Sequence, residues 1–131
     1  KKAYLVRSNA EALGLSTGAF AQALVFFLWH EMPRAARMRS LKEAVRVLGA
    51  GGRLVVVDYG ALGRRHWLHR LPFTRALLTR LEPFLDDFWR MPLARTLQEL
   101  FAARFGCAPR VREMPIFGGF YRLLVVEDSS S

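Results

Sequence analysis

The sequence contains a single cysteine, Cys107, in 131 residues. One thiol excludes an internal disulfide and a cysteine-rich metal cluster, so we expect Cys107 to pack as a small apolar residue. The chain also lacks the run of about eighteen apolar residues that a membrane span requires, because its most apolar stretch, FAQALVFFLW, stops at His30. No apolar signal region follows the two N-terminal lysines, and a cytoplasmic location is therefore the expectation.

Acidic residues are few, since 11 Asp and Glu stand against 20 Lys and Arg and give a net charge of +9. Such a charge favours an anionic partner, either nucleic acid or a membrane surface. The basic residues are nevertheless spread along the chain, without zinc-finger spacing or an aromatic-glycine RNA motif. Only three of them are lysines, and an arginine bias of this kind also arises from genome composition. We therefore expect no nucleic-acid partner.

The chain is 52% hydrophobic and long enough for one core. Ala3–Arg7 is expected to form a short strand, and the continuously apolar Gln22–Leu28 a strand that is covered on both faces. Apolar residues then recur at helical spacing over Arg34–Leu48, and Gly49 is placed to end that helix. Arg53–Asp58 predicts a further buried strand.

A strand, a helix and a strand in this order form a right-handed crossover unit, so Gln22–Leu28 and Arg53–Asp58 should lie parallel. Both strands would then end at the same edge of the sheet, where open α/β sheets bind their ligands. The residues that this edge would bring together are His30, Glu31, Asp58 and Tyr59.

The second half of the chain begins with residues 61–92, which interleave basic with large apolar residues. This basic amphipathic pattern is typical of a lid or of a membrane-facing insertion. Leu93–Phe105 predicts a helix that ends at Gly106. Two strands joined through residues 117–119 predict an antiparallel hairpin, and residues 129–131 are expected to be a frayed tail.

The stretches RSNAEAL, AFAQALVFFLWHEMP and EAVRVLGAGGRLVVVDY resemble three consecutive parts of class I S-adenosylmethionine (SAM)-dependent methyltransferases. The resemblance implies an α/β fold over residues 1–131: the C-terminal part of a Rossmann-like sheet, with parallel strands and a C-terminal antiparallel hairpin. Two departures are mild, since Ala21 stands where the family usually has aspartate and Ala50 where it usually has proline. The family's glycine-rich cofactor loop would precede Lys1, so we expect residues 1–131 alone to be inactive and to self-associate.

Four shorter stretches, LVFFLWHEMP, LVVVDYG, LEPFLDDFW and FGGFYRLLVV, are similar to the rhodoquinone biosynthesis methyltransferase-like proteins, which act on ubiquinone. This resemblance implies conversion of ubiquinone to rhodoquinone, with SAM as an amino donor and manganese as a helper. It also gives residues 64–80 a purpose, namely peripheral contact with the inner face of the membrane that holds the quinone. The alternatives are methyl transfer to another small molecule, and a non-catalytic remnant that binds a partner.

Candidate cofactor contacts come from the same resemblance. Asn9 and Ala10 match the family's adenine-contacting pair, and we add Phe27 and Leu28 at the end of the strand; an asparagine in a turn is the alternative for Asn9. The candidate catalytic residues are His30 and Glu31. The pKa of an unperturbed histidine, about 6.5, suits proton transfer, although His30 could equally be a hydrogen-bonding wall of the site.

Carboxylates and aromatic residues complete the candidate site. Glu31, Asp58 and Glu82 could supply oxygen ligands to a divalent cation, or they could be ordinary surface and capping carboxylates. Aromatic side chains near the predicted edge would suit the walls of a pocket for a ring-shaped substrate, or they could be core residues. The aromatic candidates are Tyr59, Trp89, Phe117 and Tyr121.

Overall fold

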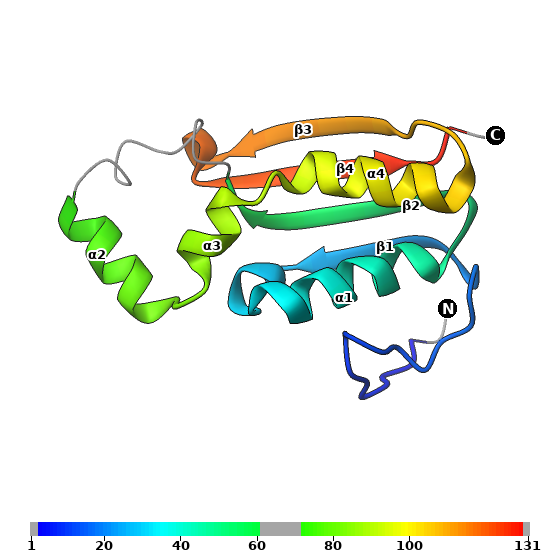
Figure 1. Cartoon of the computed structure of the whole chain (residues 1–131), viewed down its shortest axis with the longest axis horizontal. Helices are drawn as coiled ribbons and strands as arrows, with labels where there is room; N and C mark the ends of the chain where they lie inside the picture. The colour runs from blue at the N-terminus through cyan, green and yellow to red at the C-terminus, as the bar shows by residue number, and fades with distance from the viewer. Residues whose placement is uncertain (1–2, 61–71, 130–131) are drawn as a thin grey trace.

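The computed structural model describes residues 3–60 and 72–129, in which one mixed sheet carries helices on one face (Figure 1). Four strands lie in the order β1-β2-β4-β3. They are β1 (Phe20–Phe26), β2 (Leu48–Tyr59), β3 (Arg110–Ile116) and β4 (Tyr121–Glu127). The α-helices are α1 (Arg34–Arg46), α2 (Pro72–Leu81), α3 (Leu85–Arg90) and α4 (Leu93–Phe105), with short 3-10 turns η1 (Trp29–Glu31) and η4 (Phe117–Gly119).

The sheet confirms the predicted topology. β1 and β2 are parallel, with Gln22 opposite Arg53 and Phe26 opposite Val57. β4 pairs antiparallel with both β2 and β3. The C-terminal hairpin therefore extends the sheet beyond β2, as the sequence predicts, and the fold class is the expected α/β one.

The junction between α1 and β2 differs from the prediction. α1 ends at Arg46, and Val47 caps it in a right-handed conformation. Because the N–H of Phe20 donates to the carbonyl of Val47, the chain enters the sheet immediately and β2 begins at Leu48. Gly49 therefore lies inside the strand and does not end the helix. It lies close to the backbone of Gly18, since a Cβ on Gly49 would come within 3.0 Å of the Gly18 carbonyl oxygen.

Two strand predictions are corrected near the N-terminus. Ala3–Arg7 forms no strand, and its side chains are largely exposed, with Leu5 101% accessible. An extended segment becomes a strand only when a neighbour pairs with it, and no described strand lies beside this one. The second strand spans Phe20–Phe26 rather than Gln22–Leu28, because Phe27 takes a left-handed conformation (φ +48°) that ends it.

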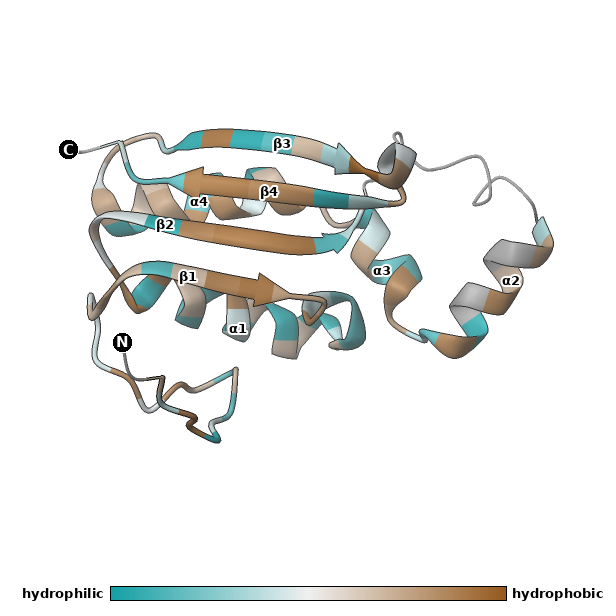
Figure 2. Ribbon diagram, turned by 180° about the vertical axis from the view of Figure 1, so that it is seen from behind, coloured by the Kyte–Doolittle hydropathy of each residue, from teal (hydrophilic) through white to brown (hydrophobic). Residues whose placement is uncertain are grey.

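The core lies between the sheet and the helices α1 and α4. Leu54 and Val56 of β2 and Leu124 and Val126 of β4 are fully buried on this side. The opposite face carries no helix in the described parts of the chain, and Figure 2, which views the sheet from that side, colours β1, β2 and β4 as largely hydrophobic strands. Leu24 and Phe26 are 61% and 63% exposed there. The prediction that this strand is covered on both faces is thus wrong for the described residues.

The helix Leu93–Phe105 is confirmed as α4, and Gly106 ends it with a φ of +77°. Cys107 is not simply an apolar filler, because its Sγ donates to a carboxylate oxygen of Asp128 over 3.2 Å. In the predicted tail, the Ser129 hydroxyl donates to the carbonyl of Ala108, whereas residues 130–131 lie outside the described part.

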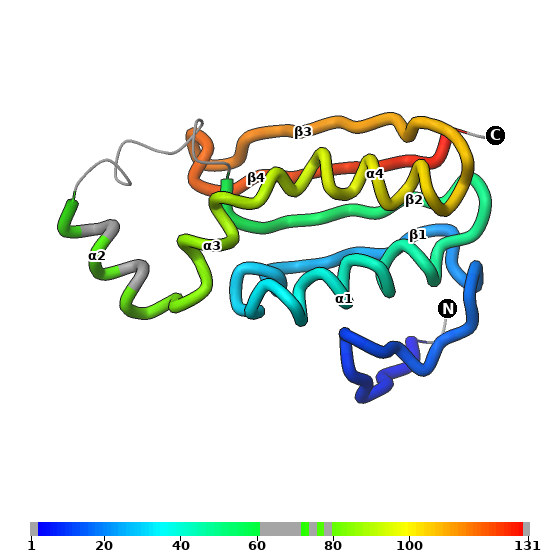
Figure 3. Tube along the Cα trace, viewed as in Figure 1, coloured from blue at the N-terminus to red at the C-terminus, as the bar shows by residue number. Residues whose placement is uncertain are grey.

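The predicted insertion, residues 61–92, is described only from residue 72 onward. Its helices α2 and α3 lie at the end of the sheet where β1 and β2 finish, and the chain then returns along the sheet as α4 (Figures 1 and 3). α2 exposes Phe73, Leu77 and Leu81. No helix among the described residues is both long and apolar enough to cross a membrane.

Candidate functional site

His30 and Asp58 meet at the carboxyl ends of β1 and β2, as the crossover unit predicts. The Nδ1 of His30 lies 2.7 Å from Oδ1 of Asp58, and the two side chains are 4% and 0% exposed. The Asp58 carboxylate also accepts the backbone N–H groups of Trp29, at 3.2 Å, and Tyr59, at 2.8 Å. Because a carboxylate only accepts, Nδ1 must donate, and Nε2 of the neutral ring is left with its lone pair.

The surroundings of His30 favour its charged form. Burial lowers the pKa of His30, but the hydrogen bond and charge of Asp58, together with the charges of Glu82 and Glu31, raise it more, so the net pKa lies above 6.5. Burial, assisted by Tyr121 and by the nearby carboxylates, also raises the pKa of Tyr59 to about 12. The Tyr59 phenol is therefore neutral at physiological pH.

Two glutamates face the other nitrogen of His30. Nε2 lies 3.9 Å from Oε1 of Glu31 and 3.8 Å from Oε2 of Glu82, and one ligand atom of each of the three residues lies within 4.8 Å of the others. Two atoms bound to one cation at about 2.1 Å lie no more than about 4.2 Å apart. The two separations from His30 fit that limit, whereas the 4.8 Å that bounds the whole group exceeds it, so the exposed Glu31 side chain would adjust when a cation binds. Asp58, the remaining sequence candidate for a metal ligand, lies behind the imidazole ring and orients it.

The predicted aromatic residues form a continuous cluster beside His30. The rings of His30 and Tyr59 are 4.7 Å apart, and Tyr59 lies 5.4 Å from Tyr121 and 6.3 Å from Trp89. Phe117 continues the cluster, 6.2 Å from Tyr121, and is 75% exposed. Trp89 and Tyr59 are buried in the core, at 5% and 9% exposure. The cluster therefore runs from the core to the surface through Tyr121 and Phe117.

The cofactor candidates divide between two places. Ala10 and Leu28 line one apolar groove of about 340 Å³, which β1, α1 and the N-terminal segment enclose. Phe27 turns instead toward the aromatic cluster, with its ring 4.9 Å from Tyr121. Asn9 is exposed and its Oδ1 accepts the N–H of Glu11 at 3.0 Å, as in an asparagine turn.

Sequence reasoning missed a buried arginine behind the site. Arg37 is 0% exposed, and burial lowers its pKa, opposed by the Asp87 charge. Its guanidinium lies over the ring of Phe88, 5.2 Å from the centroid. A signal was present, because Arg37 precedes Leu41 and Ala44 by four and seven residues and so lies on the buried face of α1.

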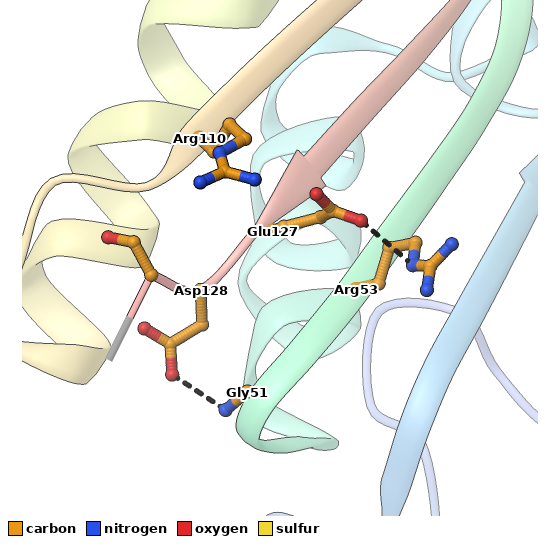
Figure 4. Close-up of a pocket in the computed structure, with 6 residues that line it drawn as sticks. Gly51, Arg53, Arg110, Glu127 and Asp128 are labelled. Carbon is orange, nitrogen blue, oxygen red and sulfur yellow. Dashed lines mark hydrogen bonds and ion pairs between the residues drawn. The ribbon is translucent and has the colours of Figure 1, made fainter. Parts of the chain in front are cut away.

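A second cavity, of about 230 Å³, lies around the start of β2, away from Asp58 (Figure 4). Its two carboxylates contact groups on neighbouring strands. Glu127 bridges Arg53, at 3.1 Å, and Arg112, at 2.9 Å, while Asp128 accepts the N–H of Gly51 at 2.8 Å. These contacts tie the strands together, and the His30 end of the sheet remains the candidate functional site.

The fold is that of SAM-dependent methyltransferase domains. A SAM-dependent methyltransferase from Thermotoga maritima matches 96% of this chain over 64% of its own length, with a TM-score of 0.63 and 16% identity. One from Methanosarcina mazei matches 92% of this chain over 65% of its own, with a TM-score of 0.56 and 19% identity.

A protein from Bordetella parapertussis described as a possible exported protein matches 93% of this chain over 43% of its own length, with a TM-score of 0.62 and 12% identity. The chain thus spans between 43% and 65% of the length of these three structures. At such identities the likeness concerns the fold. No protein-family model matches the chain, and neither does any curated protein.

Proposed function

We propose that the chain is the C-terminal part of a SAM-dependent transferase that acts on a quinone, and that the reaction is the conversion of ubiquinone to rhodoquinone. The methyltransferase fold supports the cofactor, and the stretches LVFFLWHEMP and FGGFYRLLVV support the substrate. The observation that carries the proposal is the buried His30–Asp58 pair, with Nε2 facing Glu31 and Glu82 beside aromatic rings.

In this proposal His30 and Glu31 act at the quinone through a divalent cation, manganese. Nε2 of His30 and the carboxylates of Glu31 and Glu82 would hold the cation, a mixed nitrogen and oxygen ligand set that suits it. When bound there, the cation would supply Lewis-acid polarisation of a carbonyl oxygen of the ring. Asp58 keeps Nδ1 protonated and the imidazole oriented, which is the usual role of a carboxylate behind a metal-binding histidine.

The remaining candidates bind the organic groups. We assign the adenine to Ala10 and Leu28, which line the groove beside β1, together with their chain neighbours Asn9 and Phe27. Tyr59, Tyr121 and Phe117 line the quinone ring, with Trp89 supporting Tyr59 from the core. Neutral Tyr59 can donate a hydrogen bond to a quinone oxygen.

Access to a lipid-borne quinone requires contact with a membrane surface. We propose that residues 64–80 make this contact from the cytoplasmic side. The support comes from the described part of the segment, where α2 exposes Phe73 and Leu77 and carries Arg80 in its last turn. Apolar side chains would enter the interface while arginines meet anionic headgroups.

The test supplies SAM, Mn²⁺ and a short-chain ubiquinone and identifies the product by mass spectrometry. We expect no turnover from residues 1–131 alone, and an amino-substituted quinone from a longer polypeptide that adds an upstream glycine-rich SAM loop. Glu31→Gln and Glu82→Gln should abolish the product in that polypeptide. Glu99→Gln is the matched control, because Glu99 pairs with Arg95 on the exposed surface of α4.

The same experiment separates the alternative functions. A methylated acceptor in place of an aminated quinone would mean methyl transfer. Absence of any product, together with absence of SAM binding by the longer polypeptide, would leave a non-catalytic partner-binding module.

A further inference from the structure

A buried arginine joins the two segments that carry the proposed metal ligands. Arg37 of α1 donates five hydrogen bonds, as many as a guanidinium has N–H groups. Its Nε donates to the carbonyl of Trp29 at 2.8 Å, and Nη2 to those of Met32, at 2.7 Å, and Phe84, at 3.4 Å. Nη1 donates to Asp87 at 3.0 Å and to the sulfur of Met91 at 3.8 Å.

The acceptors lie on either side of the site. Trp29 and Met32 immediately flank the pair His30-Glu31, so two of the bonds fix both ends of that short turn. The carbonyl of Phe84 lies two residues beyond Glu82, and Asp87 lies in the helix that follows. One rigid planar group thus sets the distance between the turn that carries His30 and the segment that carries Glu82.

We propose that Arg37 is a positioning residue that holds His30 and Glu31 at the separation from Glu82 at which all three can share one divalent cation. The inference rests on the proposed function, since it concerns the same metal site. Arg37 touches neither metal nor substrate in this proposal, and it acts through the backbone at Trp29, Met32 and Phe84.

The charge of Arg37 makes this role distinguishable from an electrostatic one. A positive charge close to a cation site weakens cation binding by Coulomb repulsion, so an arginine whose effect were electrostatic would lower the affinity for metal. An arginine that positions the ligands raises the affinity for metal instead. Lysine keeps the charge but has three donors on one atom and cannot span five separate acceptors.

The experiment measures the affinity of residues 1–131 for Mn²⁺ by electron paramagnetic resonance of the unbound ion. Arg37→Lys should weaken binding by about 10-fold to 100-fold, the range for outer residues of metal sites. Arg37→Met should also weaken it, although removal of a positive charge alone would strengthen it. Arg39→Met is the matched control, because the Arg39 side chain projects from the exposed side of the same helix and pairs with Glu11. Unchanged or tighter binding in both Arg37 variants would overturn the inference.

If circular dichroism shows that the Arg37 variants do not fold, two less disruptive variants in α3 replace them. Asp87→Asn weakens one of the five bonds, whereas Asp86→Asn removes the same charge from α3 at a residue that pairs with Arg90. We expect Asp87→Asn to reduce Mn²⁺ affinity more than Asp86→Asn does. Equal effects of the two variants would count against positioning.

A measurement without metal separates this inference from the proposed function. If the wild-type chain binds no Mn²⁺, the proposed cation is lost, and the amide NMR shifts of Glu31 and Glu82 then decide the positioning role. Arg37→Lys, or Asp87→Asn where the former does not fold, should move both signals, while Arg39→Met leaves them in place. Unmoved signals would overturn the inference.

Discussion

The Nδ1 of His30 and the Oδ1 of Asp58 lie 2.7 Å apart, although 28 residues separate them in the sequence. The parallel pairing of β1 with β2 creates this contact, because both strands end at the same edge of the sheet. Asp58 in turn accepts the backbone N–H of Trp29, so the same carboxylate fixes the ring and the turn that carries it. The orientation of His30 therefore depends on the sheet as a whole.

Asp58→Asn tests this dependence. The amide keeps the size of the side chain but loses its charge, so the pKa of His30 should fall, since burial then lowers it with less opposition. Hydrogen bonds to a charged group contribute about 1.5–3 kcal/mol, and we expect a loss of unfolding free energy of that order. Titration of the His30 ring protons by NMR and urea unfolding measure the two effects. Asp86→Asn is the control, and a His30 pKa equal in variant and wild type would refute the pairing.

The pH dependence of stability follows from the raised pKa of His30. Charged His30 is better stabilised in the folded than in the unfolded state, so its contribution is full below about pH 6.5 and is lost as pH rises through the folded pKa. The free energy of unfolding should therefore decline across this window. Glu43 does not affect this decline. Its pKa is lowered from 4.5, so its own contribution to stability changes only in acid. Urea unfolding, measured across the pH window of His30 and separately in acid, tests the prediction. His30→Gln should remove the decline in the His30 window.

Gly60 is predicted to be intolerant of a side chain. A Cβ at this position would lie 2.0 Å from the carbonyl oxygen of Gly119, and the N–H of Gly60 donates to the carbonyl of Phe120. Two backbone segments would have to separate, so Gly60→Ala should destabilise the chain by about 1–3 kcal/mol, the usual cost of overpacking. Gly14→Ala is the control, since nothing lies within 4 Å of a Cβ there. Equal melting temperatures of the two variants would contradict the close approach.

Local sequence patterns predicted the elements whose ends are marked by local chemistry. α4 runs over the predicted Leu93–Phe105 because apolar spacing defines its face and Gly106 can adopt a left-handed φ. The parallel β1–β2 pair followed from the order of elements alone. Gly49 failed as a helix end because a tertiary contact, the pairing of Phe20 with Val47 and Leu48, draws the chain into the sheet first.

Features that depend on distant partners could not be predicted from local sequence patterns. Ala3–Arg7 has the composition of a strand, but a strand exists only where another strand pairs with it. The same distinction applies to the residues of the candidate site. His30 and Asp58 were predicted to meet because each follows a strand, whereas the acceptors of Arg37 extend as far as Met91, 54 residues away. Only the position of Arg37 on the buried face of α1 signalled its burial.

Self-association of residues 1–131 stays a prediction, and β1 is the edge at which we expect it. Among the described residues β1 pairs only with β2, and its sequence, FAQALVF, contains no charged residue. Edge strands of monomeric proteins are usually protected by charges or proline. β3, at the other edge of the sheet, has Pro115 and three charged residues. The two edges therefore differ in protection, and β1 is the one that can pair with a second copy.

Leu24→Lys should therefore shift the chain toward the monomer, because a lysine within β1 disfavours pairing with a second copy. Leu24 is 61% exposed, so the substitution costs the fold little buried area. Phe73→Lys is the matched control, since Phe73 is 78% exposed on α2, outside the sheet. Light scattering of wild type and both variants at equal concentration measures the mass. A monomeric wild type would refute self-association, and equal loss of association in both variants would move the contact from β1 to a general apolar surface.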